Sequence, residues 1–195
     1  MKSNSNEDAS VRNSELLHSA ILQAWKCALG DKKVIYLSGP ITTGRQMLEN
    51  IRAGVIIADE VIARENSAAL VGAADTLRRE LNDIVLEPAT LCIPGWSQTE
   101  YLRLWKECIK RYVSVVMFMP GWQYSVGCVT EFGFAKTHGV NTQKIDGTEL
   151  SSEEALALLD GARSNLYPDR QHPRLRVLYE ALDTACSKLI ASGLL

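Results

Sequence analysis

The sequence predicts an α/β protein with a doubly wound parallel sheet, helices on both faces and extra helices at the two ends. Three observations support this prediction. Short apolar runs of strand length alternate with longer stretches of helical periodicity. These runs are continuously apolar, which is typical of parallel strands that are buried on both faces. Three of them end at Gly-Pro, Pro or Pro-Gly.

Four strands are predicted in order. Residues 34–40 (VIYLSGP) form the first, and residues 84–87 (IVLE) form a short second strand that ends before Pro88. Residues 113–120 (VSVVMFMP) have the strongest strand pattern, and a weaker strand follows at residues 140–145. Ligands of such sheets bind beyond the carboxyl ends of the strands, so the loops after the first three strands are the ones to examine.

Helices are predicted between the strands and at both ends. In the first helix, Leu17, Ile21 and Trp25 share one face, and Gly30 ends it. The predicted helical segments are residues 14–29, 46–65, 67–81 after a kink near Asn66, 98–112, 128–139, 152–162 and 175–191.

The predicted organisation is a disordered polar N-terminus (residues 1–13) and one α/β domain (residues 14–195). That domain has a core at residues 34–146 and a C-terminal helical extension at residues 147–195. A chain of 195 residues with 46% hydrophobic and 23% charged residues is long and apolar enough to bury a sizeable core.

Composition also excludes several function classes. The net charge of −2 argues against a dedicated nucleic-acid-binding protein. No apolar run is long enough to span a bilayer, and no signal peptide is visible, so we expect a cytoplasmic protein. Phosphate-binding P-loop and dinucleotide-binding glycine motifs are absent, and no histidine stands at metal-ligand spacing to another. Apart from Cys128, which is a candidate site residue, the five cysteines are expected to be buried thiols. We predict no metal and no cofactor.

The loop after the third strand is the most informative. Ser125, Gly127 and Cys128 stand where that loop enters the next helix. Free amide groups at a helix start can bind a phosphate or a sugar hydroxyl, Ser125 adds a donor, and Gly127 permits close approach. The alternative is an ordinary capping serine beside a turn glycine.

Glu131 follows one helical turn later. A carboxylate near the first turn is favoured by the helix dipole alone. The alternative is functional, because a partly buried carboxylate aimed into the pocket could attack the anomeric carbon of a sugar.

Other candidates lie in the first two loops. Tyr36 is either a core residue or orients the Glu131 carboxylate, and Gly39-Pro40 gives a stiff exit from the first strand. Trp96 and Tyr101 either stack on a nucleobase or belong to the core. Arg103 faces a phosphate or pairs with a local acid.

Four segments, taken together, resemble the nucleoside 2-deoxyribosyltransferase-like superfamily, most closely its small bacterial and phage members. They are YLSGPIT, EPATL, W…EYLR and MPGWQYSVGCVTEFGFAKTHG, and the resemblance covers about residues 34–145. The most specific part is PGW-x-x-S-x-G-x-x-x-E with A-x-x-x-G downstream.

The resemblance implies a doubly wound, Rossmann-like (flavodoxin-like) fold. It also implies cleavage of the N-glycosidic bond of nucleosides or their 5′-monophosphates, with the sugar passed to water or to a second base. Glu131 matches the nucleophile that forms the glycosyl-enzyme, and Tyr36 matches a tyrosine beside it. Ser125 matches a position where serine accompanies hydrolases that grip a 5′-phosphate, and Gly127 belongs to the same cradle. The residues predicted to bind substrate are Ser38, Gly39, Pro40, Trp96, Tyr101, Arg103, Gly121, Trp122, Ser125, Gly127 and Cys128.

One position departs from the family pattern. The family has an aspartate in the helix after the YLR-like segment, where this chain has Trp105 or Lys106. Glu107 is the nearest acid and is predicted as the third catalytic residue, with Glu87 as an alternative. Loss of a proton donor weakens activation of the leaving base, because general acid catalysis contributes about 10²–10⁴-fold.

These observations predict a nucleotide N-glycosidase or deoxyribosyltransferase that acts through a covalent glycosyl-Glu131 intermediate. The alternatives are a nucleotide-binding or sensing module on the same fold and a purely structural assembly protein. The expected partners are a nucleoside or nucleoside monophosphate and further copies of the chain in a homodimer or larger homo-oligomer, with no nucleic-acid polymer and no membrane.

Overall fold

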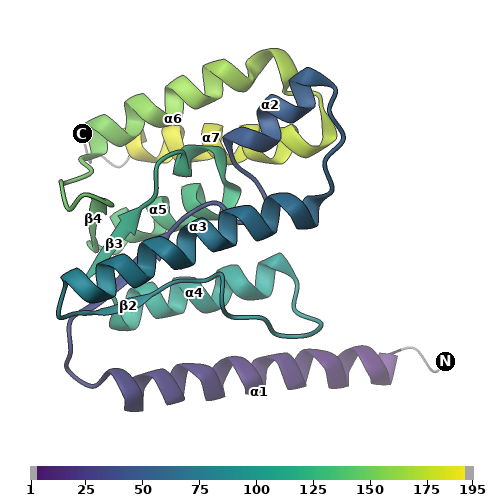
Figure 1. The fold of residues 1–195 in the computed structure, drawn as a ribbon. Coiled ribbons are helices and arrows are strands. Elements are labelled where there is room, and N and C mark those ends of the chain that lie inside the picture. The colour runs from purple at the N-terminus through teal and green to yellow at the C-terminus, as the bar shows by residue number, and fades with distance from the viewer. Residues whose placement is uncertain (1–3, 192–195) are drawn as a thin grey trace.

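The structure is a computed structural model that describes residues 4–191, and the side chains of residues 13–191 (Figure 1). It confirms the predicted doubly wound α/β fold, because four parallel strands alternate with helices. In chain order the elements are α1 (Asn4–Leu29), β1 (Val34–Ser38), α2 (Arg45–Ala53), α3 (Asp59–Glu80), β2 (Ile84–Leu86), α4 (Gln98–Tyr112), β3 (Val115–Phe118), the 3₁₀-helix η1 (Trp122–Tyr124), α5 (Val126–Thr137), β4 (Asn141–Lys144), α6 (Ser152–Leu166), the 3₁₀-helix η2 (Tyr167–Asp169) and α7 (Pro173–Ala191).

The strand order in the sheet is β2-β1-β3-β4. After β1 the chain moves to one side to form β2 and then crosses to the other side to form β3. Ser38, the last residue of β1, pairs with Phe118, the last residue of β3. The strand order therefore reverses between the carboxyl ends of β1 and β3, which is where open α/β sheets form a ligand-binding crevice.

Alternation along β1 directs its side chains to two different cores. Ile35 and Leu37 lie in the apolar cluster beneath α3, together with Leu70. Tyr36 belongs to the larger cluster formed with α4, α5 and the C-terminal helices. Figure 1 shows α3 on one side of the sheet and α4 and α5 on the other. Because side chains alternate with a period of two, Ser38 faces the same way as Tyr36.

The helices at the two ends extend the same core. Helix α1 runs beside α4 (Figure 1), where the Trp25 ring stacks on the Trp105 ring with centroids 5.1 Å apart. Helices α6 and α7 pack on each other and on the core, and Leu159 and Leu182 are fully buried. The amide of Asn165 in α6 donates to the hydroxyl of Tyr124 in η1 at 3.0 Å. The C-terminal extension therefore supports the loop that follows β3.

The break between the second and third helices differs from the prediction. It lies at residues 54–58 rather than near Asn66, because Gly54 takes a left-handed conformation (φ 65°) and caps α2. Asn66 lies inside α3 and donates to the carbonyls of Ile41 and Thr43 at 2.9 and 2.8 Å. It holds the loop after β1 in place instead of ending a helix.

Several other boundaries also differ. Helix α1 begins at Asn4, not at residue 14, because neither glycine nor proline interrupts the chain before Gly30. The segment expected to be disordered is thus helical over residues 4–13, and residues 1–3 lie outside the described residues. Cys27 and Cys92 are exposed, in contrast to the expectation for the cysteines, whereas Cys108, Cys128 and Cys186 are buried.

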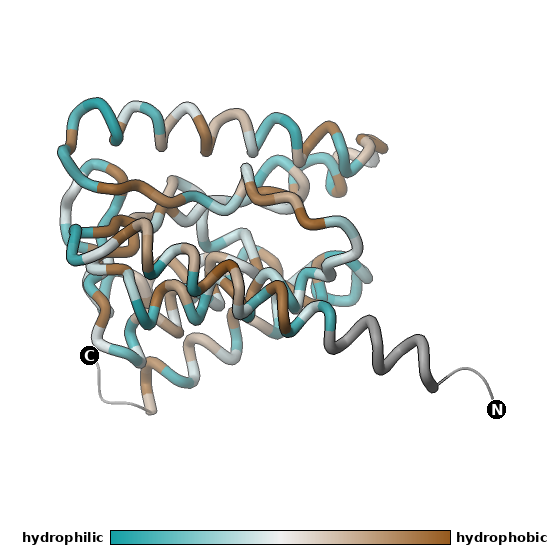
Figure 2. The backbone as a smooth tube through the Cα atoms, turned by 90° about the horizontal axis from the view of Figure 1, so that it is seen from below, coloured by the Kyte–Doolittle hydropathy of each residue, from teal (hydrophilic) through white to brown (hydrophobic). Residues whose placement is uncertain are grey.

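The hydropathy of the chain follows this architecture. Figure 2 shows hydrophilic and hydrophobic residues alternating along the outer helices, as expected where each helix buries one side. Among the described residues, no helix is both long and apolar enough to cross a membrane.

Gly39, one of the predicted site residues, stands where α3 and the loop after β3 come close to the end of β1, and this close approach explains why a glycine is needed there. A Cβ atom there would lie 2.8 Å from Leu70 Cδ1 and 2.9 Å from Met119 Cγ. We expect Gly39→Ala to lower the free energy of unfolding by about 1–3 kcal/mol, because overpacking forces neighbours to shift. Gly161→Ala is the control, since a Cβ atom there meets nothing within 4 Å. Denaturant unfolding measures both, and equal stability of Gly39→Ala and wild type would contradict the packing argument.

Candidate active site

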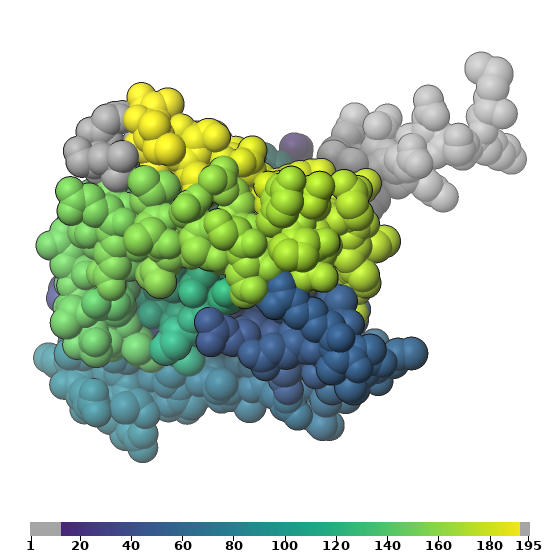
Figure 3. Space-filling model, turned by 90° about the horizontal axis from the view of Figure 1, so that it is seen from above, coloured from purple at the N-terminus to yellow at the C-terminus, as the bar shows by residue number. Residues whose placement is uncertain are grey.

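The candidate site lies at the carboxyl ends of β1 and β3, where the strand order reverses. It combines the end of β1, the loop after β3 and the first two turns of α5. Seen from above, the teal residues near position 120 are visible between the green residues of α6 and the blue residues of α2 and α3 (Figure 3). This part of the site therefore reaches the molecular surface.

Glu131 is the centre of the site. Its side chain is only 5% exposed, and it lies on the side of α5 that faces β1. The Tyr36 hydroxyl donates to Oε1 at 2.8 Å, and the Ser38 hydroxyl donates to Oε2 at 2.6 Å. Each carboxylate oxygen thus accepts one hydrogen bond and keeps a second lone pair.

The backbone before α5 determines where Glu131 points. Gly121 takes a left-handed conformation (φ 81°) and starts η1, and Ser125 then adopts an extended conformation at the N-cap of α5. Gly127 and Cys128 are four and three residues before Glu131, so all three lie on one face of the helix. The start of α5 and the carboxylate therefore present a continuous surface to the end of β1.

Burial dominates the electrostatics of this carboxylate. Removal from water raises the pKa of Glu131 from its ordinary value of 4.5 to about 7, although hydrogen bonds from Ser38 and Tyr36 and the charge of Lys106 act in the opposite direction. Glu131 therefore titrates near neutral pH. Burial and the neighbouring carboxylate raise the pKa of Tyr36 well above 10. The phenol stays protonated as a donor.

The thiol of Cys128 is a packing element of the same site. Burial, followed by the charge of Glu131, raises the pKa of Cys128 to about 12, so the thiol is neutral. Ser125 and Ser38 act in the opposite direction and lower the pKa of this thiol in part. Cys128 lies between the start of α5 and the end of β1, and its neutral state makes it a poor nucleophile.

The space at Gly127 is bounded by polar groups. A Cβ atom built on Gly127 would lie 3.8 Å from Ser125 Oγ and 3.9 Å from the side-chain nitrogen of Gln98. The Ser125 side chain makes no capping hydrogen bond to its own helix, so the interpretation of Ser125 as an ordinary capping side chain fails. Gln98 is a candidate binding residue that the sequence analysis missed, because it had been used only to mark the start of a helix.

Arg45 is a second residue that the sequence analysis missed. It is exposed at the start of α2, and its guanidinium lies 5.3 Å from the centre of the Tyr124 ring. Tyr124 directly precedes Ser125, so a cation stands close to the proposed cradle. A basic residue shortly after a glycine-containing loop was the available signal in the sequence.

Some predicted substrate-binding residues are used in packing. Trp122 is 3% exposed, and its ring contacts those of Phe118 and Phe132 with centroids 5.0 and 4.9 Å apart. Gly121 supplies the turn described above, and Pro40 packs beside Gly44 in the loop after β1. These residues shape the loops around Glu131.

Three further predicted residues lie on the α1 side of α4 or within its preceding loop. Trp96 contacts the His18 ring of α1, with centroids 6.4 Å apart, and Arg103 pairs with Glu15 of α1 at 3.8 Å. The Tyr101 hydroxyl contacts both the amide (2.6 Å) and the carbonyl (3.2 Å) of Ile93 and so closes the loop after β2. The structure does not bring these side chains to Glu131.

Glu107 also has another partner. Its carboxylate pairs with Arg111 at 2.7 Å on the next turn of α4. At one of the two positions expected for the family aspartate, Trp105 is buried and its ring lies 5.3 Å from that of Tyr36. Trp105 therefore places an apolar ring beside Tyr36 in the site. The carboxylate of Glu107 pairs with Arg111 and not with a residue of the site.

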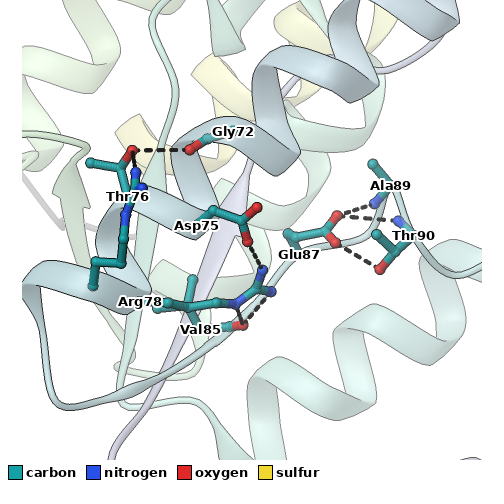
Figure 4. Close-up of polar contacts among 9 residues, drawn as sticks. Gly72, Asp75, Thr76, Arg78, Val85, Glu87, Ala89 and Thr90 are labelled. Atoms are coloured by element: carbon teal, nitrogen blue, oxygen red, sulfur yellow. Dashed lines mark hydrogen bonds and ion pairs between the residues drawn. The ribbon is translucent and has the colours of Figure 1, made fainter.

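Glu87, the alternative acid, organises the turn after β2 (Figure 4). Its Oε2 accepts from the amides of Ala89 and Thr90 at 2.6 and 3.2 Å, and its Oε1 accepts from the Thr90 hydroxyl at 2.6 Å. The adjacent strand is held by Arg78, which donates to the carbonyl of Val85 at 3.1 and 2.8 Å. The contacts of Glu87 are thus those of a buried loop-capping carboxylate.

Comparison with known proteins identifies the family. A family described as a domain of unknown function, DUF4406, matches residues 33–143, which is more than half of the chain. The chain belongs to the DUF4406 family. No curated protein and no solved structure matched the chain.

The DUF4406 match includes the whole candidate site. Tyr36, Ser38 and Glu131 all lie inside residues 33–143, whereas α1, α6 and α7 lie outside that range. Across the part of the chain that the structure covers, no group of three or more His, Cys, Asp or Glu side chains is arranged to hold a metal ion.

The raised pKa of Glu131 predicts a pH dependence of stability. The folded protein holds this proton more tightly than the unfolded chain, whose carboxyl has a pKa near 4.5. The stabilising contribution is therefore complete below pH 4.5 and is lost as the pH rises through about 7. It amounts to about 3 kcal/mol.

Glu131→Gln, which cannot titrate, should lack this contribution. Unfolding free energies of both proteins between pH 4.5 and pH 8 measure the difference, and wild type should lose about 3 kcal/mol relative to the variant. Parallel stability curves would show that Glu131 is not buried as described.

Proposed function

We propose that this DUF4406 protein cleaves the N-glycosidic bond of a nucleoside 5′-monophosphate through a covalent Glu131 intermediate. The observation that carries the proposal is the buried Glu131 carboxylate, held by two hydroxyl donors at the point where the strand order reverses. It has no cationic partner within ion-pair distance among the described residues, so its charge remains available for reaction.

The proposed reaction proceeds by two displacements. A Glu131 oxygen attacks C1′ of the sugar, the C1′–N bond breaks, and its electron pair leaves with the base, which takes a proton from solvent water. Water or a second base then attacks C1′ and releases the carboxylate, so the configuration at C1′ is retained overall. Tyr36 and Ser38 orient the carboxylate and favour its ionised form.

The start of α5 provides a place for the 5′ end of the substrate. Ser125 offers a hydroxyl, and Gly127 leaves the backbone open one turn before Glu131. A group bound over Gly127 would direct the attached sugar toward the carboxylate on the same helix face. Positioning of this kind supplies a large share of catalysis in two-substrate and displacement reactions.

The resemblance to the nucleoside 2-deoxyribosyltransferase-like superfamily supports the same assignment through Glu131, Tyr36 and Ser125. It also motivates the proposal of a homodimer or larger homo-oligomer, which stays a prediction. We propose membership of this superfamily, a nucleoside 5′-monophosphate as substrate, and water or a second base as the acceptor of the sugar.

A second candidate is a nucleotide-sensing module without turnover. It is favoured by one observation: Glu107, the acid predicted to replace the family aspartate, is paired with Arg111 and so is not free to protonate a leaving base. An assay for free base distinguishes the glycosidase from the sensing module, because a sensor binds nucleoside monophosphates without releasing the base.

Glu131→Gln tests the nucleophile. We expect release of free base from nucleoside monophosphates, measured by chromatography, to fall below detection, because the amide cannot form the glycosyl ester. Glu107→Gln is the matched carboxylate control and should retain activity, since Glu107 is engaged by Arg111. Full activity in Glu131→Gln would refute the mechanism, and binding without base release in the wild type would favour the sensor.

Ser38→Ala tests the hydrogen bond to the nucleophile. Base release should rise with pH through about 7 as Glu131 ionises. Because the Ser38 hydroxyl lowers the pKa of Glu131, its removal should move the midpoint of this profile to higher pH. It should also reduce the rate at neutral pH by about 10-fold, as expected for one hydrogen bond to a charged group. A midpoint displaced to lower pH would contradict the arrangement.

A further inference from the structure

A cavity lies away from Glu131, on the outer side of α5. It has a volume of about 430 Å³ and is bounded by α4, α5 and α7. That volume lies within the range of small-molecule sites. Glu131, Tyr36 and Ser38 do not line it, so it is distinct from the candidate active site.

The floor of this cavity is open and apolar. Val129 and Ala185 are buried beneath it, and a Cβ atom built on Gly133 would meet nothing within 4 Å. The wall contains the Phe134 ring, which stacks on the His138 ring with centroids 4.0 Å apart. These surfaces fit a ligand with a planar apolar body.

Two lysines supply the charge. Lys106 on α4 places its ammonium 5.9 Å from the centre of the Phe134 ring, and Lys188 on α7 also lines the cavity. Within the residues described, neither ammonium forms an ion pair. Among the described residues of the lining, Glu180 is the one carboxylate, and it pairs with Arg176 on its own helix at 3.8 Å.

The threonine hydroxyls in the lining do not compete as donors. Thr130, Thr137 and Thr184 each donate to the carbonyl four residues earlier, at 2.7, 2.7 and 2.8 Å. Their protons are therefore used within their own helices. The two ammonium groups remain as donors for a ligand, and they select for negative charge.

We propose that the cavity between α4, α5 and α7 binds a small organic anion with a planar apolar body. Lys106 and Lys188 bind the anionic group, and the apolar body lies over Gly133 against Phe134. This site is separate from the proposed glycosidase site and is tested without its activity, although the charge of Lys106 also lowers the pKa of Glu131.

A pair of fluorescent probes tests the ligand class. 1-Anilinonaphthalene-8-sulfonate has a planar apolar body and a sulfonate, and N-phenyl-1-naphthylamine has the same rings without the charge. In fluorescence titrations at low ionic strength, we expect the folded protein to bind the sulfonate at one site and the neutral probe at least about 10-fold more weakly. Equal affinities, or no binding of the sulfonate, would overturn the proposal.

Two variants test the location. Gly133→Leu fills the cavity and should abolish binding of the sulfonate probe, whereas Gly161→Leu on α6, where a Cβ atom also meets nothing within 4 Å, should bind as wild type does. Lys106→Met with Lys188→Met keeps the apolar stems and should remove the preference for the anion. Circular dichroism checks the fold of each variant. Unchanged binding in Gly133→Leu, or an unchanged anion preference in the double lysine variant, would place the probe elsewhere and refute the site.

Discussion

The hydrogen bonds from Tyr36 and Ser38 to Glu131 are the constraint on which the arrangement of the site depends. A buried carboxylate is costly unless its oxygens accept hydrogen bonds, and these two hydroxyls come from alternate positions of β1, one of the two inner strands. They join α5 to β1 at the end of the sheet. The same contacts hold Glu131 near its ionisation point at neutral pH, because they partly offset the effect of burial on its pKa.

The topology of the sheet makes this contact possible. Because β1 lies between β2 and β3, its carboxyl end is next to the loop that leads into α5. The left-handed turn at Gly121 and the short helix η1 then place the start of α5 over that end. The additional helix α6 supports the turn through the bond from Asn165 to Tyr124, so a segment outside the DUF4406 match helps to position the site inside it.

Much of the fold could be predicted because its signals are local. The continuous apolar runs marked β1 and β3, and the predicted boundaries of α4 agree with residues 98–112. The predicted position of the break between α2 and α3 was wrong. Asparagine is frequent in turns, but the side chain of Asn66 lies within α3 and binds the loop after β1. Glu131 and Tyr36 were placed together correctly, but Gln98 and Arg45 were missed because only folding brings them near Ser125 or Tyr124.

The order of strands and helices can be predicted from the sequence, because side-chain periods of two and of about four residues act over short distances along the chain. The contact between Tyr36 and Glu131, 95 residues apart, does not follow from these periods. The residues left it as one of two alternatives for Tyr36, and the family resemblance implied it. Which side chains of α4 face the site depends on how the helices pack around it. Helix α4 is covered by the sheet on one side and by α1 on another, so its apolar pattern marks two buried surfaces at once. Arg103 and Trp96 consequently contact α1, a segment about 80 residues away in the sequence, and Trp105 contacts Tyr36.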